Sequence, residues 1–226
     1  MSTTDHVGLS RQQVARALRN FTLMGAFWSV YGPNATAAGP ILSGFSLEIG
    51  LSDTQIAFLV SLTGLMGISQ LLSYFLTRRA QDKRRMMVIL GCCEITLVSL
   101  LAVAGLKLPP AYRFPGIAAL LAAGLAFGHA VSPAWNSWFS NIVPSEIRST
   151  YIGRRMLIIT GVGMAYLFLA SRWLDVAPKP LGFLPIFILG WFGGVAGYMV
   201  AARTPYPRIA EQTASPGHAL WRPLRE

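Results

Sequence analysis

The sequence predicts an all-α integral membrane protein with six transmembrane helices. Of its 226 residues, 53% are hydrophobic and only 12% are charged. That charged share is about half of the roughly 25% usual in soluble domains. The apolar residues gather in six runs, each close to the roughly 20 residues that a helix needs to cross the hydrocarbon core. A soluble domain of this length has no core large enough for so much apolar surface.

The six predicted spans follow one another with short polar breaks between them. A polar head, residues 1–19, precedes the six-span bundle of residues 20–202, and a proline-containing polar tail, residues 203–226, follows it. We expect the first run to be kept as a span and not cleaved as a signal peptide, because the polar head before it is long. The spans are predicted at 20–45, 54–77, 86–106, 115–140, 156–174 and 183–202.

Lys and Arg are distributed unequally between the two sides that these spans define. Fifteen of the 19 fall in the head, the second break, the fourth break and the tail, and the other four fall on the opposite side. The positive-inside rule therefore predicts a plasma (inner) membrane protein with both termini in the cytoplasm. The net charge of +10 does not indicate nucleic-acid binding, because it is spread over four separate segments and forms no single basic face.

Polar and helix-breaking residues recur in spans one and four. The first span contains AFWSVYGPNATAAGP, in which Trp28, Tyr31 and Asn34 are three residues apart and share a helix face. The fourth contains SPAWNSWFSN, in which Trp135 and Asn136 follow a proline. Two interpretations stay open: an interfacial tryptophan belt with asparagines joining helices, or a substrate cavity lined by these five residues. Trp28 lies about 13 Å into its span, deeper than a belt, which favours the cavity there.

Two ionisable groups are predicted inside the spans. Glu94, in GCCEITL, is the only acid well inside a span, and His129 is the only histidine in one. A membrane carboxylate indicates proton or ion coupling, and a protonated or hydrogen-bonded structural Glu is the alternative. For His129 a packed, hydrogen-bonded role is favoured over proton transfer.

Sequence motifs of enzymes and metal sites are missing. The chain contains no GxSxG, HExxH or GxxxxGK[ST] pattern, so we expect no enzymatic activity, no cofactor and no metal site. Cys92 and Cys93 are adjacent and cannot form an ordinary disulfide with each other. Gly190 and Gly194 in GWFGGVAG are four residues apart, a spacing that allows close helix approach.

The end of the fourth span and the break after it resemble the major facilitator superfamily of transporters. The stretch PAWNSWFSNIVPSEIRSTYIGRR is similar to a bacterial subgroup pattern, paW-x-sW-x-aDlvP-x-x-x-RGrYfGrR, with matches that include Trp135, Trp138, Pro144, Arg148 and Arg155. The basic break YFLTRRAQDKRR stands where the family has G-x-L-x-D-R-x-G-R-R/K. Its candidate motif residues are Arg78, Arg79, Asp82, Arg84 and Arg85.

The resemblance covers about residues 20–203 and implies the N-terminal six-helix half of a twelve-helix fold. Such a half contains two nested three-helix inverted repeats, with spans one and four lining the cavity and spans two and five facing the other half. The resemblance implies a half-size secondary transporter that moves a small organic solute by alternating access. Its expected partners are the lipid bilayer and a second six-helix half, either a second copy or a separate chain.

Two departures from the family pattern keep other functions open. Asn141 stands where the fourth-span motif usually has Asp, and Arg78 stands where the basic loop usually has an acid. A non-transporting scaffold or assembly subunit of a larger membrane complex is the alternative, and a truncated transporter is a third interpretation.

Overall fold

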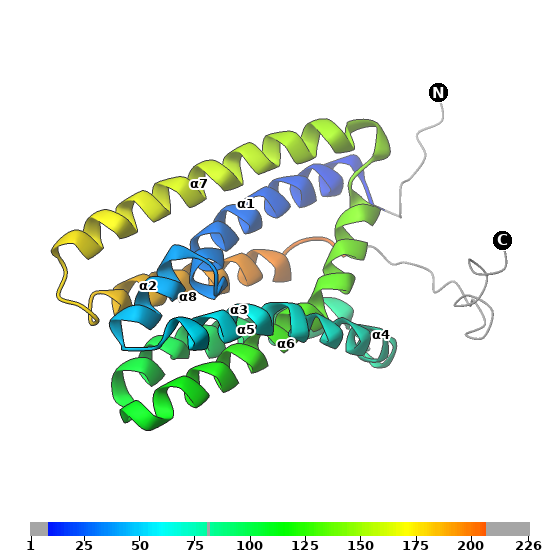
Figure 1. Ribbon diagram of the computed structural model, residues 1–226. Coiled ribbons are helices and arrows are strands. Elements are labelled where there is room, and N and C mark those ends of the chain that lie inside the picture. The colour runs from blue at the N-terminus through cyan, green and yellow to red at the C-terminus, as the bar shows by residue number, and fades with distance from the viewer. Residues whose placement is uncertain (1–8, 81, 207–226) are drawn as a thin grey trace, which may run out of the picture.

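The computed structural model describes residues 9–80 and 82–206, and the described chain is built from helices (Figure 1). The helices are α1 (Arg11–Ala35), α2 (Pro40–Glu48), α3 (Asp53–Met66), α4 (Gln70–Arg79), α5 (Lys83–Lys107), α6 (Pro110–Ile142), α7 (Arg148–Val176) and α8 (Phe183–Ala202). A short 3-10 turn, Gly67–Ser69, joins α3 to α4, so that these two helices run on as one apolar segment.

Side chains at the helix starts explain several of these boundaries. Ser10 and Gln13 form a capping box at α1, because the Gln13 amide donates to Ser10 Oγ at 3.3 Å and Ser10 N donates to Gln13 Oε1 at 2.8 Å. Ser52 and Gln55 repeat this arrangement at α3. At α5 the Asp82 carboxylate accepts from the Arg85 amide at 2.9 Å.

Five helical segments of the described chain are long and apolar enough to cross a membrane, which supports the prediction of a helical membrane protein. They are residues 53–73, 83–107, 110–142, 145–176 and 183–202. The continuous span predicted at 20–45 is wrong, because α1 ends at Ala35 and α2 begins at Pro40. The backbone is extended at Thr36 and Gly39, and Pro40 stands at the first position of α2, where its missing amide donor costs nothing.

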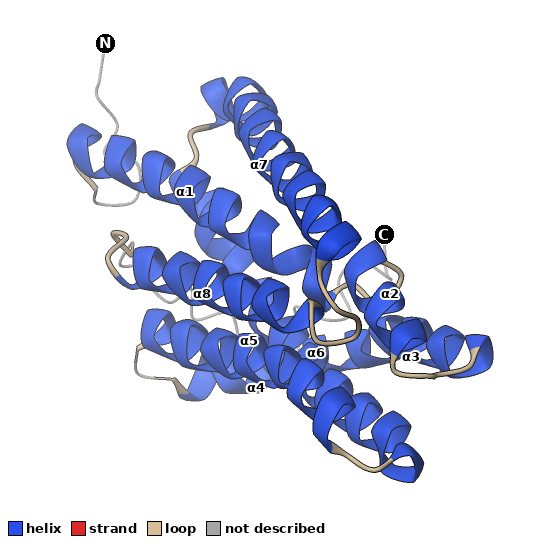
Figure 2. Cartoon of the chain, turned by 90° about the vertical axis from the view of Figure 1, so that its left-hand side faces the viewer, coloured by secondary structure: helices blue, strands red, loops and turns tan. Residues whose placement is uncertain are grey.

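The helices pack in a continuous series. α1 packs against α7 on one side and α8 on the other, α8 packs on α5, α5 on α6, and α6 on the α3–α4 segment. Figure 2 shows α7 and α1 at one edge of the bundle and α8 beside α5 in its middle. The cavity described below lies between α1 and α6. The poorly buried α7 packs on the outer side of α1, and the poorly buried α3–α4 segment packs on the outer side of α6.

Glycines on α8 allow close helix approach, as their spacing predicted. The Asn34 side-chain amide lies directly over Gly190, and a Cβ at Gly194 would lie 2.5 Å from Ile95 Cδ1. Asn34 is 1% exposed, and its Nδ2 donates to Ile186 O at 3.1 Å while its Oδ1 accepts from the Tyr166 hydroxyl at 3.0 Å. This amide therefore joins α1, α7 and α8.

The predicted basic side is one end of the bundle. The start of α1 meets the end of the described chain where Asn20 Nδ2 donates to Thr204 Oγ1 at 3.1 Å, and Arg84 Nη1 at the start of α5 donates to Thr204 O at 3.4 Å. Nearby, the Trp138 indole donates to Pro205 O at 3.2 Å. Burial, and then the Asp82 carboxylate, raise the pKa of Tyr206, whose ring packs on Trp138.

At the opposite end, two of the four remaining cations bond to groups at helix ends. Lys179 forms an ion pair with Glu48 at 3.1 Å. Arg113 Nη1 donates to Ile49 O at 2.9 Å, and its Nε donates to Leu108 O at 3.1 Å. The other two are Lys107, which ends α5, and Arg172 near the end of α7, whose guanidinium lies over the Phe168 ring. The two groups of cations that the sequence separates therefore lie at opposite ends of the helices.

Candidate functional site

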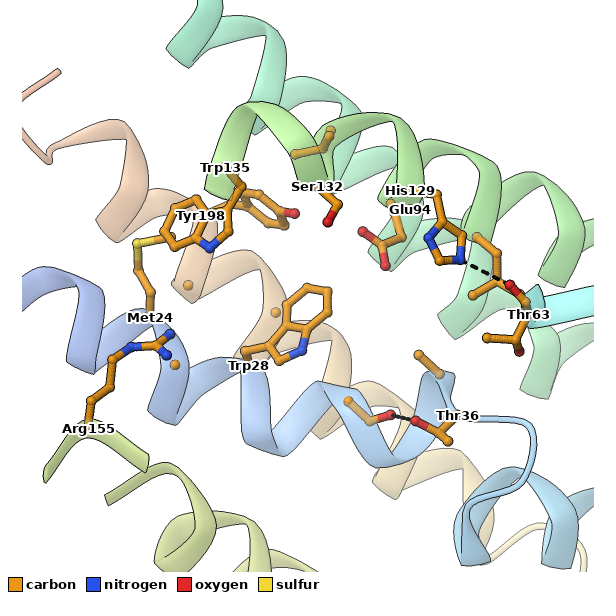
Figure 3. Close-up of a pocket in the computed structure, with 18 residues that line it drawn as sticks. Met24, Trp28, Thr36, Thr63, Glu94, His129, Ser132, Trp135, Arg155 and Tyr198 are labelled. Carbon is orange, nitrogen blue, oxygen red and sulfur yellow. Dashed lines mark hydrogen bonds between the residues drawn. The ribbon is translucent and has the colours of Figure 1, made fainter. Parts of the chain in front are cut away.

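A cavity of about 470 Å³ lies between α1 and α6, with further wall from α3, α5, α7 and α8. We call it the central cavity (Figure 3). It is not closed in the single chain, because Trp28 in its wall is 41% exposed. The lining side chains used below are Trp28, Glu94, His129, Trp135, Arg155 and Tyr198.

Three large aromatic side chains, Trp28, Trp135 and Tyr198, line the central cavity. Trp28 stands edge-on to Tyr31, with ring centroids 4.9 Å apart, and to Tyr198 at 6.5 Å. Across from them Trp135 packs edge-on against Trp138 at 5.3 Å. Trp28 and Trp135, two of the residues predicted to line a cavity, therefore both contribute to its wall from different helices.

Glu94 brings a carboxylate into the cavity wall from α5. It is 5% exposed and lies against Gly128 of α6, where a Cβ would come 2.6 Å from the carboxylate carbon. The hydroxyls of Tyr31 and Tyr198 are within electrostatic range of it. The Tyr31 hydroxyl and Glu94 Oε2 nevertheless have no hydrogen-bond partner of good geometry among the described residues. The nearness of Tyr31 to Glu94 alone does not satisfy either group. The Tyr31 hydroxyl and Glu94 Oε2 therefore both keep unused hydrogen-bonding capacity.

His129 lies at the cavity wall but uses both ring nitrogens to hold α6 to the α3–α4 segment. Its Nε2 lies 3.2 Å from Thr63 O, which can only accept, and its Nδ1 lies 3.5 Å from the Gln70 side-chain amide nitrogen, which can only donate. These two partners fit the neutral tautomer with the proton on Nε2. The adjacent turn is tied in the same way by Ser69 Oγ, which donates to Ala126 O at 3.0 Å.

Arg155 enters the cavity from α7. Its Nε donates to Phe21 O of α1 at 3.2 Å, its guanidinium stacks over the Phe139 ring with 5.4 Å to the centroid, and its Nη2 lies against Gly25. The sequence pattern suggested a residue of the break between spans four and five. The structure instead has α7 begin at Arg148, so Arg155 lies two turns inside the helix.

Three residues predicted as cavity candidates do not line the cavity. Tyr31 is fully buried behind Trp28, Asn34 forms the helix-joining bonds described above, and Asn136 is exposed. Tyr198 of α8 does line the cavity and was missed. The sequence could have indicated it, because Tyr198 is the only tyrosine in the last predicted span.

The residues of the predicted loop motif act locally in the structure. Arg148 Nη2 donates to Ser140 O and Val143 O, both at 3.1 Å, and so caps the end of α6 just before Pro144. Asp82 caps α5, and Arg84 reaches Thr204 O. Arg85 contributes its amide to the Asp82 cap. The side chains of Arg78 and Arg79 lie outside the described residues, as do residues 1–8 of the head and 207–226 of the tail.

The fold and the cavity define a helical membrane protein with an aromatic-walled central cavity that contains one carboxylate and one guanidinium. Within the described ranges, no three His, Cys, Asp or Glu side chains gather into a metal-binding group. Comparison of the chain with protein-family models, curated proteins and solved structures gives no match.

Proposed function

We propose that the chain is one half of a facilitator-type secondary transporter. It pairs with a second six-helix half, either another copy or a separate chain, and moves a small organic solute by alternating access of the cavity between two bundles. The observation that carries this proposal is the central cavity, which has aromatic walls and a small number of polar groups, as small-molecule sites do.

Burial of the helices supports pairing across the cavity. Within their apolar windows, 39% of α5 and of α8 is buried, whereas only 17% of the α3–α4 segment and 11% of α7 is buried. The two poorly buried helices are the outer neighbours of α6 and α1, the helices that line the cavity. A second half docked over the cavity would contact these two helices.

The packing order supports two inverted repeats of three spans each. The first three spans would be α1, α3–α4 and α5, and their counterparts would be α6, α7 and α8. The contact of α1 with α7 then corresponds to that of α6 with α3–α4, and the contact of α1 with α8 corresponds to that of α6 with α5. The contact of α5 with α8 corresponds to itself. In this scheme α1 and α2 together form the first span of the chain, which completes the set of six. Its break at Thr36–Gly39 is acceptable at membrane depth because Thr36 faces the cavity and not lipid.

The charge distribution supports a location in the plasma (inner) membrane with both termini in the cytoplasm. The basic end of the bundle carries most of the Lys and Arg, and such ends face the cytoplasm. Under this orientation the Arg155 side of the cavity lies nearer the cytoplasm.

Disulfide cross-linking tests the pairing. In a chain carrying Cys92→Ala and Cys93→Ser, Leu157→Cys on α7 is expected to give cross-linked dimers in native membranes, or a cross-link to a separate second half, since Leu157 is 77% exposed. Leu189→Cys on α8 is the matched control, because Leu189 is 54% exposed but lies on a helix away from the proposed interface. Equal cross-linking at both positions would count against this interface.

Reconstitution tests transport itself. The purified full chain in liposomes, alone or with the captured second half, is expected to take up a member of a panel of small organic solutes. A strictly monomeric chain with no uptake of any solute would overturn the proposal. Stable recovery with an unrelated membrane complex, and no uptake, would instead support the scaffold alternative.

A further inference from the structure

The central cavity contains one acidic and one basic side chain that are not paired with each other. We propose that it binds an organic zwitterion whose ammonium and carboxylate are separated by an apolar spacer. The ammonium lies at Glu94, the carboxylate at Arg155, and the spacer against the aromatic wall. The binding site stands on its own geometry, and only the statement that this zwitterion is transported rests on the proposed function.

The acidic end of the site is a buried carboxylate with one unsatisfied oxygen. Glu94 is 5% exposed, its Oε2 has no hydrogen-bond partner among the described residues, and Figure 3 shows its carboxylate directed into the cavity. A buried carboxylate oxygen without a partner is costly, and a protonated ligand amine supplies both a donor and the opposite charge.

The basic end of the site has free donors. Arg155 uses Nε for Phe21 O and its ring face for Phe139, and no hydrogen bond from Nη1 or Nη2 is found in the described part of the chain. The guanidinium stays charged in proteins and presents its two outer nitrogens as a fork that matches a carboxylate. Its two existing contacts hold it in place before a ligand arrives, which lowers the cost of ordering it.

The two ends are too far apart for one ligand group to meet both. Arg155 Nη2 lies against Gly25, and Glu94 lies within electrostatic range of Tyr31. These two α1 residues are six positions apart, which is about 9 Å along a helix. Figure 3 shows Arg155 and Glu94 on opposite sides of the site with Trp28 between them. The ligand therefore needs an apolar segment between its charges that can lie on Trp28.

Charge balance favours a zwitterion over a singly charged ligand. A monovalent amine would leave the half-buried Arg155 facing its apolar spacer, and a monovalent carboxylate would leave Glu94 unsatisfied. Leaving Glu94 Oε2 or the outer nitrogens of Arg155 without a partner costs binding free energy. A ligand with both charges matches both ends.

Binding of three matched probes to the purified full chain tests this inference. Isothermal titration in nanodiscs compares 6-aminohexanoate with hexylamine and hexanoate, which each keep one charge and the same spacer length. We expect 6-aminohexanoate to bind about tenfold or more tightly than either, since a hydrogen bond to a charged group contributes at least about a factor of ten.

Two conservative variants assign the ends. Glu94→Gln is expected to weaken 6-aminohexanoate about tenfold and to leave hexanoate unchanged, whereas Arg155→Lys weakens 6-aminohexanoate and hexanoate but not hexylamine. Glu48→Gln and Arg154→Lys are the matched controls, because Glu48 pairs with Lys179 away from the cavity and Arg154 is exposed. Both controls are expected to bind all three probes as the unmodified chain does.

The inference is overturned if hexylamine or hexanoate binds as tightly as 6-aminohexanoate, if none of the three binds, or if the variants weaken all probes equally. Liposome uptake of labelled 6-aminohexanoate separates this result from the proposed function. Selective binding without uptake leaves the site standing and counts against transport. Uptake of other solutes without selective binding of 6-aminohexanoate supports transport and overturns the zwitterion site.

Discussion

The Gly190→Val variant is expected to lose about 3 kcal/mol of the free energy of unfolding. A side chain at Gly190 would occupy the position of the Asn34 amide, which is 1% exposed and cannot move outward. Overpacking alone costs about 1 to 3 kcal/mol. Displacing Asn34 also breaks its bonds to Ile186 O and the Tyr166 hydroxyl, each contributing about 1 kcal/mol.

Gly161→Val is the matched control for this prediction. Gly161 lies on α7, and a Cβ placed there meets nothing within 4 Å. The same β-branched residue is therefore introduced into a helix without a packing conflict, so a change below about 1 kcal/mol is expected. Unfolding by sodium dodecyl sulfate titration in mixed micelles, followed by circular dichroism, measures both variants. Equal losses would show that the α1–α8 contact does not limit stability.

The Trp138→Ala variant is expected to lose about 3 kcal/mol. Trp138 is 1% exposed and packs with Phe21, Trp135 and Tyr206 at centroid distances of 5.4, 5.3 and 5.2 Å. Truncating a buried aromatic residue costs about 3 to 5 kcal/mol in soluble cores. We take the lower figure because lipid is as apolar as the protein interior, which leaves mainly the packing contacts to be lost.

Two further variants separate the contributions at this position. Trp138→Phe keeps an aromatic ring but removes the indole donor to Pro205 O, so a loss of about 1 kcal/mol is expected. Trp173→Ala on α7 truncates a tryptophan that is 46% exposed and is expected to cost less than Trp138→Ala, although its indole donates to Gly182 O. The same micelle titration applies. A larger loss for Trp173→Ala would contradict the assigned role of Trp138.

Five of the six predicted spans correspond to helices long and apolar enough to cross a membrane, and the remaining prediction shows the limit of counting apolar residues. The run 20–45 is apolar enough to suggest one helix, but its ends depend on local backbone chemistry. The capping box at Ser10 starts α1 at Arg11, nine residues before the predicted span begins at residue 20, and Pro40 starts a new helix after the break. A count of apolar residues does not register either effect.

The site was predictable only in part. Trp28, Glu94 and Trp135 were identified because large or polar groups are unusual inside a span, and the structure brings them to one cavity. Asn34 and Asn136 carry the same kind of signal, yet one is turned toward α8 and the other is exposed. One helical residue corresponds to a rotation of about 100°, so a polar type alone does not fix the face it occupies.

Arg155 is the clearest case of a residue whose sequence context misled. Basic residues after a span indicate the cytoplasmic side, and the positive-inside rule treats them as a group. The structure separates neighbours within that group, because Arg154 is exposed whereas Arg155 bonds to Phe21 O and lines the cavity. The distinction depends on which way α7 is rotated against α1, and that rotation is set by packing between residues far apart in the chain.

The length of α6 has a consequence for the bilayer around the protein. Its 33 residues extend for about 50 Å, well beyond the hydrocarbon thickness of about 30 Å. The segment from Pro115 to Pro133 measures about 28 Å, close to that thickness. In a thinner membrane, α6 would have to tilt or the bilayer would have to deform around it. Such tilting would change the distance between α6 and α1, and this couples the width of the cavity to lipid chain length.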